Sequence, residues 1–280
     1  MLGEYISPML VAEIKNAHLR LFNFLKEEVA VQPKFDGIRM QAHKFRNDIW
    51  LFSRSGILCN DKFPEIVDGL RKYQHDFILD CEAVSFKDGK IDFANVNKKF
   101  HSGEGTAVLV AFDILHLDGI DLHENGYYNR LKHLFMIEHS NVLMQCPTKI
   151  IHDPKKLREY YADYLKQGYE GIIVRELTKP YMCKRDIAVQ KIKPMRSMDV
   201  MIEDIELGKK GFFSYVVKTK EGTIAKIPTR AVLEKGQIVE MRHEGFIDSD
   251  KYPLGFTVRF PTLFRVRFDL KEPQSVEGVR

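Results

Sequence analysis

Apolar residues recur at two different spacings along this chain. Between residues 29 and 111 most apolar runs are short and alternating, which predicts strands over 29–31, 38–42, 49–52 and 77–84. A helical spacing instead predicts a helix over residues 8–25, with an apolar stripe of Leu10, Ile14, Ala17, Leu21 and Leu25. A second helix is indicated by Asp153 as N-cap, Pro154 at the first helical position and Gly168 after the last turn.

The pattern changes near residues 194–199. Beyond this point short β-rich runs alternate with glycine-containing turns, which is typical of a small closed β-barrel. We therefore expect an α+β protein with two domains. Residues 1–195 are predicted to form a domain of antiparallel sheets with helices, and residues 196–280 the barrel.

Composition narrows the class of protein without naming a function. The chain is 44% hydrophobic and 29% charged, as ordinary globular proteins are, and its net charge of +4 permits nucleic-acid binding without requiring it. Its four cysteines form no C-x-x-C pair, so we expect reduced thiols in a cytoplasmic protein, with neither zinc nor disulfides. No signal peptide and no membrane-spanning run is evident.

Three polar clusters stand out from the strand pattern. The first is Lys34-Phe35-Asp36-Gly37-Ile38-Arg39, which could also be a surface hairpin turn because Asp-Gly is a common turn pair. In 77–84 the period of two puts Asp80 and Glu82 on one strand face, either as a solvated edge or as a site. In 188–194 Lys191 and Lys193 share a face, where they repel each other unless an anion lies between them.

Read in chain order, these clusters resemble the motifs of the covalent nucleotidyltransferases. Segments 34–39, 79–82, 111–119, 170–175 and 190–194 resemble motifs I, III, IIIa, IV and V. Segments 53–56 and 265–269 resemble the stretch after motif I and the motif VI region of DNA ligases. Three positions depart from the pattern: Gln32 replaces a Glu, Cys81 replaces a Gly, and Leu270 separates Asp269 from Lys271.

The resemblance implies an ATP-dependent DNA ligase of the minimal two-domain type. In this family an adenylation (nucleotidyltransferase) domain precedes an OB-fold domain, and nicks with 5′-phosphate and 3′-hydroxyl ends are sealed through lysyl-AMP and adenylated DNA. Such enzymes serve DNA repair, replication and recombination. The expected partner is nicked duplex DNA, bound by a monomer of bacterial, archaeal or viral origin.

Residue roles follow from the same resemblance. Lys34 is the expected nucleophile, with Lys191 and Lys193 on the α-phosphate and Asp36 near the reacting 3′ end. ATP is the expected cofactor with Mg²⁺, or Mn²⁺, because carboxylates such as Glu170 and Glu82 suit hard cations. The expected nucleotide contacts are Gln32, Pro33, Arg39, Glu82, Phe112 and Arg267. Arg39 and Arg54 are expected on the 5′-phosphate of the nick.

Two alternatives remain open at this point. An RNA ligase or an mRNA capping enzyme shares motifs I, III, IV and V, and differs in its nucleotide or its nicked substrate. A non-catalytic nucleic-acid-binding protein would use the basic and aromatic residues of the barrel, and would form no covalent nucleotide adduct.

Overall fold

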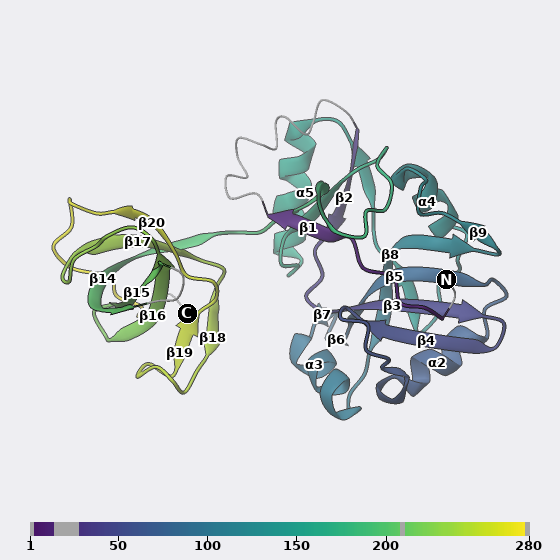
Figure 1. Cartoon of the computed structure of the whole chain (residues 1–280), viewed down its shortest axis with the longest axis horizontal. Coiled ribbons are helices and arrows are strands. Elements are labelled where there is room, and N and C mark those ends of the chain that lie inside the picture. Colours follow the sequence, from purple (N-terminus) through teal and green to yellow (C-terminus); the bar gives the residue numbers. More distant parts are fainter. Residues whose placement is uncertain (1–2, 14–27, 208–210, 278–280) are drawn as a thin grey trace. The chain divides into compact units, whose positions relative to one another are not determined.

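The computed structural model describes residues 3–13, 28–207 and 211–277, and the chain divides into two compact units, 1–192 and 193–280 (Figure 1). Where the sequence predicts a helix over 8–25, residues Leu10–Glu13 form strand β1, and residues 14–27 lie outside the described residues. The helix prediction is wrong at 10–13 because β1 pairs with strand β13, and such tertiary pairing overrides local apolar spacing.

The first unit contains two large sheets. The five-stranded sheet has the order β1 (Leu10–Glu13), β13 (Arg185–Ile192), β12 (Ile172–Glu176), β2 (Val29–Pro33), β11 (Lys149–Ile151). The six-stranded sheet has the order β10 (Leu143–Gln145), β8 (Val108–Leu117), β5 (Phe77–Val84), β3 (Ile38–Phe45), β4 (Asp48–Ser53), with β9 (Ile120–Asp121) beside β8. A short hairpin joins β6 (Phe86–Lys87) and β7 (Lys90–Ile91).

Most strand pairs are antiparallel, as the sequence predicts, but two pairs are parallel. They are β1 with β13 and β10 with β8. The strands of each pair are distant in the sequence, so no tight hairpin fixes their direction. The four predicted strands are confirmed as β2, β3, β4 and β5, and β5 has the predicted bounds.

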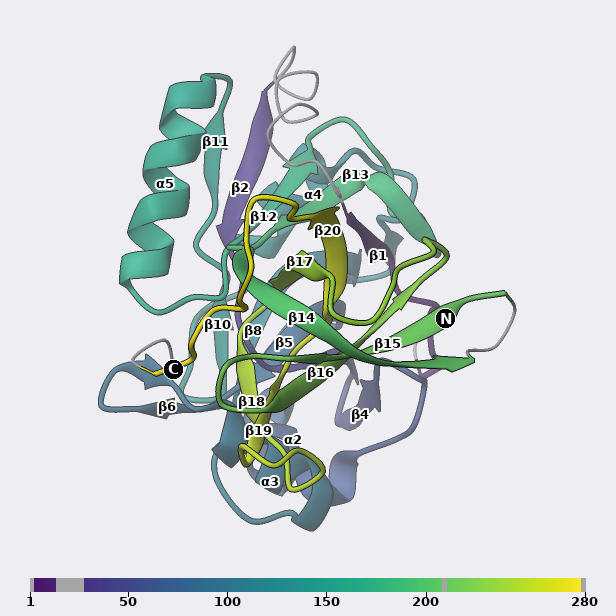
Figure 2. The ribbon, with the colours of Figure 1, turned by 90° about the vertical axis from the view of Figure 1, so that its left-hand side faces the viewer.

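Helices pack on the two sheets, and each sheet forms a separate hydrophobic core with its helices. The helices are η1 (Asn60–Lys62), α2 (Pro64–Arg71), α3 (Phe93–Ser102), α4 (Tyr127–Leu134) and α5 (Pro154–Lys166). The predicted second helix is confirmed as α5. As predicted, Asp153 caps it by accepting a hydrogen bond from Lys155 N at 2.8 Å. This helix lies beside β2 (Figures 1 and 2). Its residues Leu157 and Tyr164 share a buried core with Val29 and Val31 of that strand. The larger core lies between the six-stranded sheet and α2, α3 and α4.

The second unit is built on one antiparallel sheet. Its order is β16 (Thr223–Thr229), β15 (Phe213–Lys218), β14 (Arg196–Leu207), β17 (Ile238–His243), β20 (Thr262–Val266) (Figure 2). A separate hairpin joins β18 (Phe246–Asp248) and β19 (Phe256–Val258). Alternate residues of β14, Met198, Val200 and Ile202, are buried in a core of this unit's own.

Strands therefore dominate both units, and the helices are few. None of the helices in the described ranges is long and apolar enough to cross a membrane.

Candidate active site

Lys34 lies in a loop that connects the two sheets of the first unit. Strand β2 ends at the buried Pro33 in one sheet, and β3 begins at Ile38 in the other. The alternative interpretation of Asp36-Gly37 as a hairpin turn is therefore wrong, because a hairpin joins neighbouring strands of one sheet. Asp36 is partly exposed in this loop.

Gly37 is required by a close approach of the loop to β5. A Cβ at this position would stand 2.8 Å from Cγ of Glu82 and 2.9 Å from Cγ1 of Val84, with the carbonyl oxygen of Ala83 closer still. Carbon atoms in favourable contact lie about 3.5–4.0 Å apart, so no side chain fits. The glycine thus brings the loop after Lys34 directly onto the strand that carries Glu82.

Lys34 is joined to Glu170 by both backbone and side chain. Lys34 N donates to Gly171 O at 2.9 Å, and Glu170 N donates to Lys34 O at 3.1 Å. The Lys34 ammonium group also forms an ion pair with the Glu170 carboxylate. Their side chains are 21% and 16% exposed, so a ligand from solvent can reach both.

Glu82 is a second carboxylate beside Lys34. Burial raises the pKa of Glu82 to about 7; the positive charges of Lys34 and Arg39 oppose this rise, and the negative charge of Glu170 adds to it. Glu82 is thus close enough to both Lys34 and Glu170 for their charges to act on it. In the described ranges no three His, Cys, Asp or Glu side chains are grouped as a metal site. The two carboxylates near Lys34 are oxygen ligands of the kind that suits Mg²⁺, whose other ligands are usually phosphates and water.

Asp80, on the same strand, is not part of a solvated edge. Strand β5 pairs on both sides, and the Asp80 side chain is 1% exposed. It accepts hydrogen bonds from Arg39 Nε at 2.9 Å and Nη2 at 2.5 Å, and from Tyr181 Oη at 2.6 Å. Burial disfavours the charged guanidinium, but Asp80 outweighs it and raises the pKa of Arg39. Asp80 thus fixes the orientation of Arg39.

Phe112, the expected adenine platform, is partly exposed on β8. Two guanidinium groups approach its ring: Cζ of Arg175 lies 4.9 Å and Cζ of Arg39 lies 5.4 Å from the ring centroid. Such contacts are favourable cation–π interactions. A base stacked on Phe112 would therefore lie beside groups that are already held in place.

Gln32 is fully engaged in the protein. Its Nε2 donates to Tyr127 Oη and to Thr148 Oγ1, both at 2.9 Å, and its Oε1 accepts from Arg175 Nε at 3.0 Å. The side chain is 1% exposed. The expected contact of Gln32 with adenine stays a prediction; the contacts present make this amide a support for Arg175.

Next to Gln32, the charged residues Arg130, Asp113 and Arg175 form a buried network that the sequence does not predict. Arg130, 1% exposed on α4, donates to both oxygens of the fully buried Asp113 at 2.7 and 3.1 Å. Arg175 adds a third bond to Asp113 at 3.3 Å. The one sign of this network in the sequence is an arginine on the apolar face of a helix, between Tyr127 and Leu134. Arginine is seldom buried unless it is paired.

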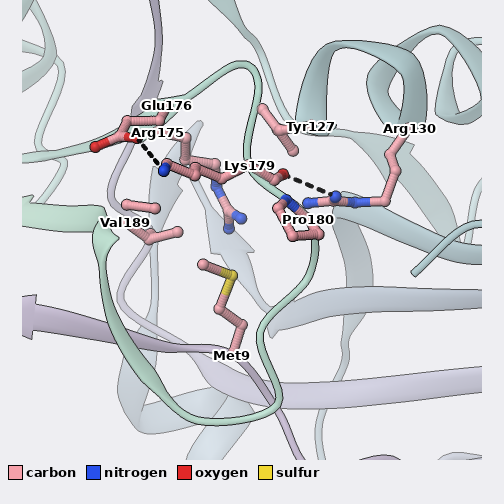
Figure 3. Close-up of a pocket in the computed structure, with 9 residues that line it drawn as sticks. Met9, Tyr127, Arg130, Arg175, Glu176, Lys179, Pro180 and Val189 are labelled. Carbon is pink, nitrogen blue, oxygen red and sulfur yellow. Dashed lines mark hydrogen bonds and ion pairs between the residues drawn. The ribbon is translucent and has the colours of Figure 1, made fainter. Parts of the chain in front are cut away.

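A small pocket borders this network rather than Lys34 (Figure 3). Arg130 Nη1 donates to Lys179 O at 3.2 Å, and the Lys179 ammonium lies 3.9 Å from Glu176. The pocket is lined by Met9, Tyr127, Arg130, Arg175, Glu176, Lys179, Pro180, Ala188 and Val189. Because this lining contains neither Lys34 nor Glu82, we do not assign the nucleotide to it.

Lys191 and Lys193 fall in different units. Lys191 is on β13, opposite Ile173 of β12, and is partly exposed. Lys193 is the first residue of the second unit, and its ammonium pairs with Glu244 at 3.0 Å. A phosphate shared by the two lysines stays a prediction.

Arg54 is exposed at the tip of a three-residue loop. Ser53 N donates to Ile57 O at 2.8 Å and Gly56 N donates to Ser53 O at 2.9 Å. Gly56 has a φ of 80°, so the loop is a type I turn closed by a glycine bulge. At this loop Arg54 is exposed to solvent, where an anion can reach it.

Arg267 of the second unit is held by two carboxylates. Its Nη1 donates to both oxygens of Asp199 at 2.8 and 3.0 Å, and its Nε and Nη2 donate to Asp269 at 2.9 and 2.8 Å. The hydrogen bonds to Asp269 raise the pKa of Arg267; burial opposes this rise, and the charge of Asp199 adds to it. Binding of pyrophosphate by Arg267, as expected from the sequence, requires that some of these contacts be exchanged.

Comparison with known proteins places these features in one family. A family model described as the ATP dependent DNA ligase domain matches residues 8–193. A probable DNA ligase of Nocardioides sp. is 29% identical over 99% of this chain and 62% of its own length. The chain spans 55–62% of the length of the first curated relatives that it matches.

Two solved structures share the fold. The ligase domain of LigD from M. tuberculosis has a TM-score of 0.61 and 20% identity, covering 95% of this chain and 96% of that one. A Lig E DNA ligase, studied for DNA binding with a minimal scaffold, has a TM-score of 0.66 and 17% identity, covering 94% and 100%. At these identities the likeness concerns the fold alone.

Proposed function

Because this chain belongs to the ATP-dependent DNA ligase family, we propose that it uses ATP to seal nicks in duplex DNA, working as a monomer. One observation carries the proposal. A partly exposed lysine, Lys34, forms an ion pair with Glu170, and the glycine of its loop packs against the strand that carries a second carboxylate, Glu82, whose pKa responds to the charge of Lys34. A lysine in such a position can accept a nucleotide and pass it on.

The proposed reaction has three transfers. First, Lys34 Nζ loses a proton and attacks the α-phosphate of ATP; the Nζ–P bond forms as the bond to the bridging oxygen breaks, and pyrophosphate leaves. Second, an oxygen of the 5′-phosphate at the nick attacks this phosphorus and releases Lys34. Third, the 3′-hydroxyl loses its proton, attacks the 5′-phosphate and expels AMP.

The residues around Lys34 supply charge and position for the first transfer. Phe112 would stack on the adenine, with Gln32 and Pro33 near its edge, and Glu82 would bind the ribose. Lys191 and Lys193 would neutralise the α-phosphate and, by charge repulsion, favour the neutral amine of Lys34. Mg²⁺, held by Glu170 and Glu82, would stabilise negative charge on the phosphates. Arg39 and Arg54 would hold the 5′-phosphate of the nick, and Asp36 would lie near its 3′ end.

The two units would take different roles. We propose that the first unit (1–192) is the nucleotidyltransferase domain predicted over residues 1–195, and that the second unit (193–280) is the OB-fold predicted over residues 196–280. Support for the barrel comes from the edge strands β16 and β20 of the five-stranded sheet, whose Cα atoms come within 8 Å of each other. Arg267 of this domain would orient the leaving pyrophosphate once its contacts to Asp199 and Asp269 are exchanged.

Intact-protein mass spectrometry after incubation with ATP and Mg²⁺ tests the proposal. We expect a gain of one AMP, mapped to Lys34 and absent from Lys34→Ala, while the exposed Lys155→Ala on α5 serves as the control and is labelled normally. Normal labelling of Lys34→Ala would refute the assignment. Labelling by GTP in place of ATP would indicate a capping enzyme, and sealing of nicked RNA in place of nicked DNA an RNA ligase.

A further inference from the structure

Residues Gly3–Met9, here called the N-terminal strap, are bonded to two buried polar residues of β3. Ile6 N donates to Gln41 Oε1 at 3.0 Å, and Gln41 Nε2 donates to Ile6 O at 3.2 Å. Gly3 N donates to His43 Nδ1 at 3.2 Å, so the proton of the neutral ring is on Nε2, which donates to Gln41 Oε1 at 2.8 Å. Gln41 and His43 are 3% and 0% exposed.

These two polar residues have no part in the proposed reaction. Burying them is unfavourable unless their hydrogen bonds are made, and the strap makes them. Burial also lowers the pKa of His43 to about 3, so the neutral ring that the strap requires persists at ordinary pH. The strap is therefore fixed to the sheet by specific bonds rather than by apolar contact alone.

The strap also contacts the loop that carries Arg54, through Tyr5. The Tyr5 hydroxyl donates to the carbonyl oxygen of Arg54. The Tyr5 ring lies against Phe52, with centroids 5.9 Å apart, and under Gly56, where an added Cβ would stand 2.8 Å from Tyr5 Cδ1. One side chain thus supports the loop on two sides while leaving the Arg54 guanidinium exposed.

We propose that Tyr5 is a positioning residue for recognition of the 5′-phosphate at the nick. The proposal rests on the proposed function, in which Arg54 binds that phosphate. By fixing the backbone of the loop before DNA arrives, Tyr5 reduces the conformational entropy that is lost when Arg54 engages the phosphate. Tyr5 itself does not touch the substrate.

Tyr5→Phe tests this directly, because it keeps the ring and removes the hydroxyl. The readout is the affinity for a nick with a 5′-phosphate relative to a nick with a 5′-hydroxyl, measured with the full chain by fluorescence anisotropy. We expect this preference to fall by about fivefold, the effect of one net hydrogen bond. Formation of lysyl-AMP should be unchanged. Tyr73→Phe, which removes a comparable hydroxyl bonded to Glu138 O at 2.9 Å, should behave as wild type.

Four outcomes decide between the possibilities. An unchanged phosphate preference in Tyr5→Phe, or an equal loss of affinity for both nicks, overturns the proposal, since a purely structural role predicts the latter. In an Arg54→Ala background Tyr5→Phe should have no further effect, and an independent loss there also overturns it. Failure of the wild-type protein to form lysyl-AMP or to seal a nick would instead refute the proposed function.

Discussion

The raised pKa of Glu82 predicts a specific dependence of stability on pH. Its value of about 7 lies above the ordinary 4.5, so between these values the folded protein binds a proton that the unfolded chain has released. The stability that this group contributes is therefore complete below pH 4.5 and is lost as pH rises through 7. A difference of 2.5 pKa units, from 7 minus 4.5, corresponds to about 3 kcal/mol at 1.36 kcal/mol per unit.

Replacing Glu82 with Gln keeps the shape of the side chain and abolishes this titration. Between pH 5 and pH 8 the wild type should lose about 2–3 kcal/mol relative to Glu82→Gln, because about 0.8 kcal/mol is already lost below pH 5. Urea unfolding of nucleotide-free protein, followed by fluorescence, measures this. Trp50, the chain's single tryptophan, is on β4 and reports on the first unit alone.

Glu159→Gln is the matched control, since Glu159 is exposed on α5. Its stability should follow the wild-type curve across the same pH range. If the curves of wild type and Glu82→Gln are parallel, Glu82 does not titrate near neutrality and the electrostatic account of this site is wrong.

Two further substitutions test how the site is supported. Gly37→Ala should destabilise the first unit by about 1–3 kcal/mol and slow lysyl-AMP formation at least tenfold, because the added methyl group collides with β5; wild-type stability in urea would contradict the close approach. Arg130→Met should cost about 3–5 kcal/mol by leaving Asp113 buried without its main partner, and Arg130→Met/Asp113→Leu should be less destabilised than the sum of the single variants. Strict additivity in urea unfolding would show that the two residues do not act as a pair.

The sequence predicts those helices and strands whose formation depends on residues that are close together in the chain. The period of two over 77–84 predicts the observed bounds of β5, and the cap at Asp153 predicts where α5 begins. The spacing over 8–25 fails at 10–13 because the same apolar residues also suit a strand, and pairing with β13 decides between them. The parallel direction of β1 and β10 has the same origin, since their partners are far away in the sequence.

The site depends on contacts that no local pattern contains. Lys34 and Glu170 are 136 positions apart, and only the resemblance to known motifs indicates that they act together. The departure at Gln32 is visible in the sequence, whereas its role as a support for Arg175 requires the structure. Asp113 lies inside a recognised motif, yet its pairing with Arg130 could be expected only if the face of α4 toward the sheet were known.

Four of the residues expected to bind phosphate share one electrostatic feature. Lys34 pairs with Glu170, Arg39 with Asp80, Lys193 with Glu244, and Arg267 with Asp199 and Asp269. Each cation thus has a carboxylate partner within its own unit, which removes the repulsion that clustered positive charges would otherwise create.

If Lys34, Lys193 and Arg267 bind phosphate as proposed, they would exchange these carboxylate partners for it rather than simply add a ligand. The released carboxylates are then free to bind a cation, and for Glu170 that cation would be Mg²⁺ carried in with ATP. Arg39 differs from the other three: its partner Asp80 is buried and bonded to Tyr181, so this pair should persist and hold the guanidinium in place when the nucleotide binds.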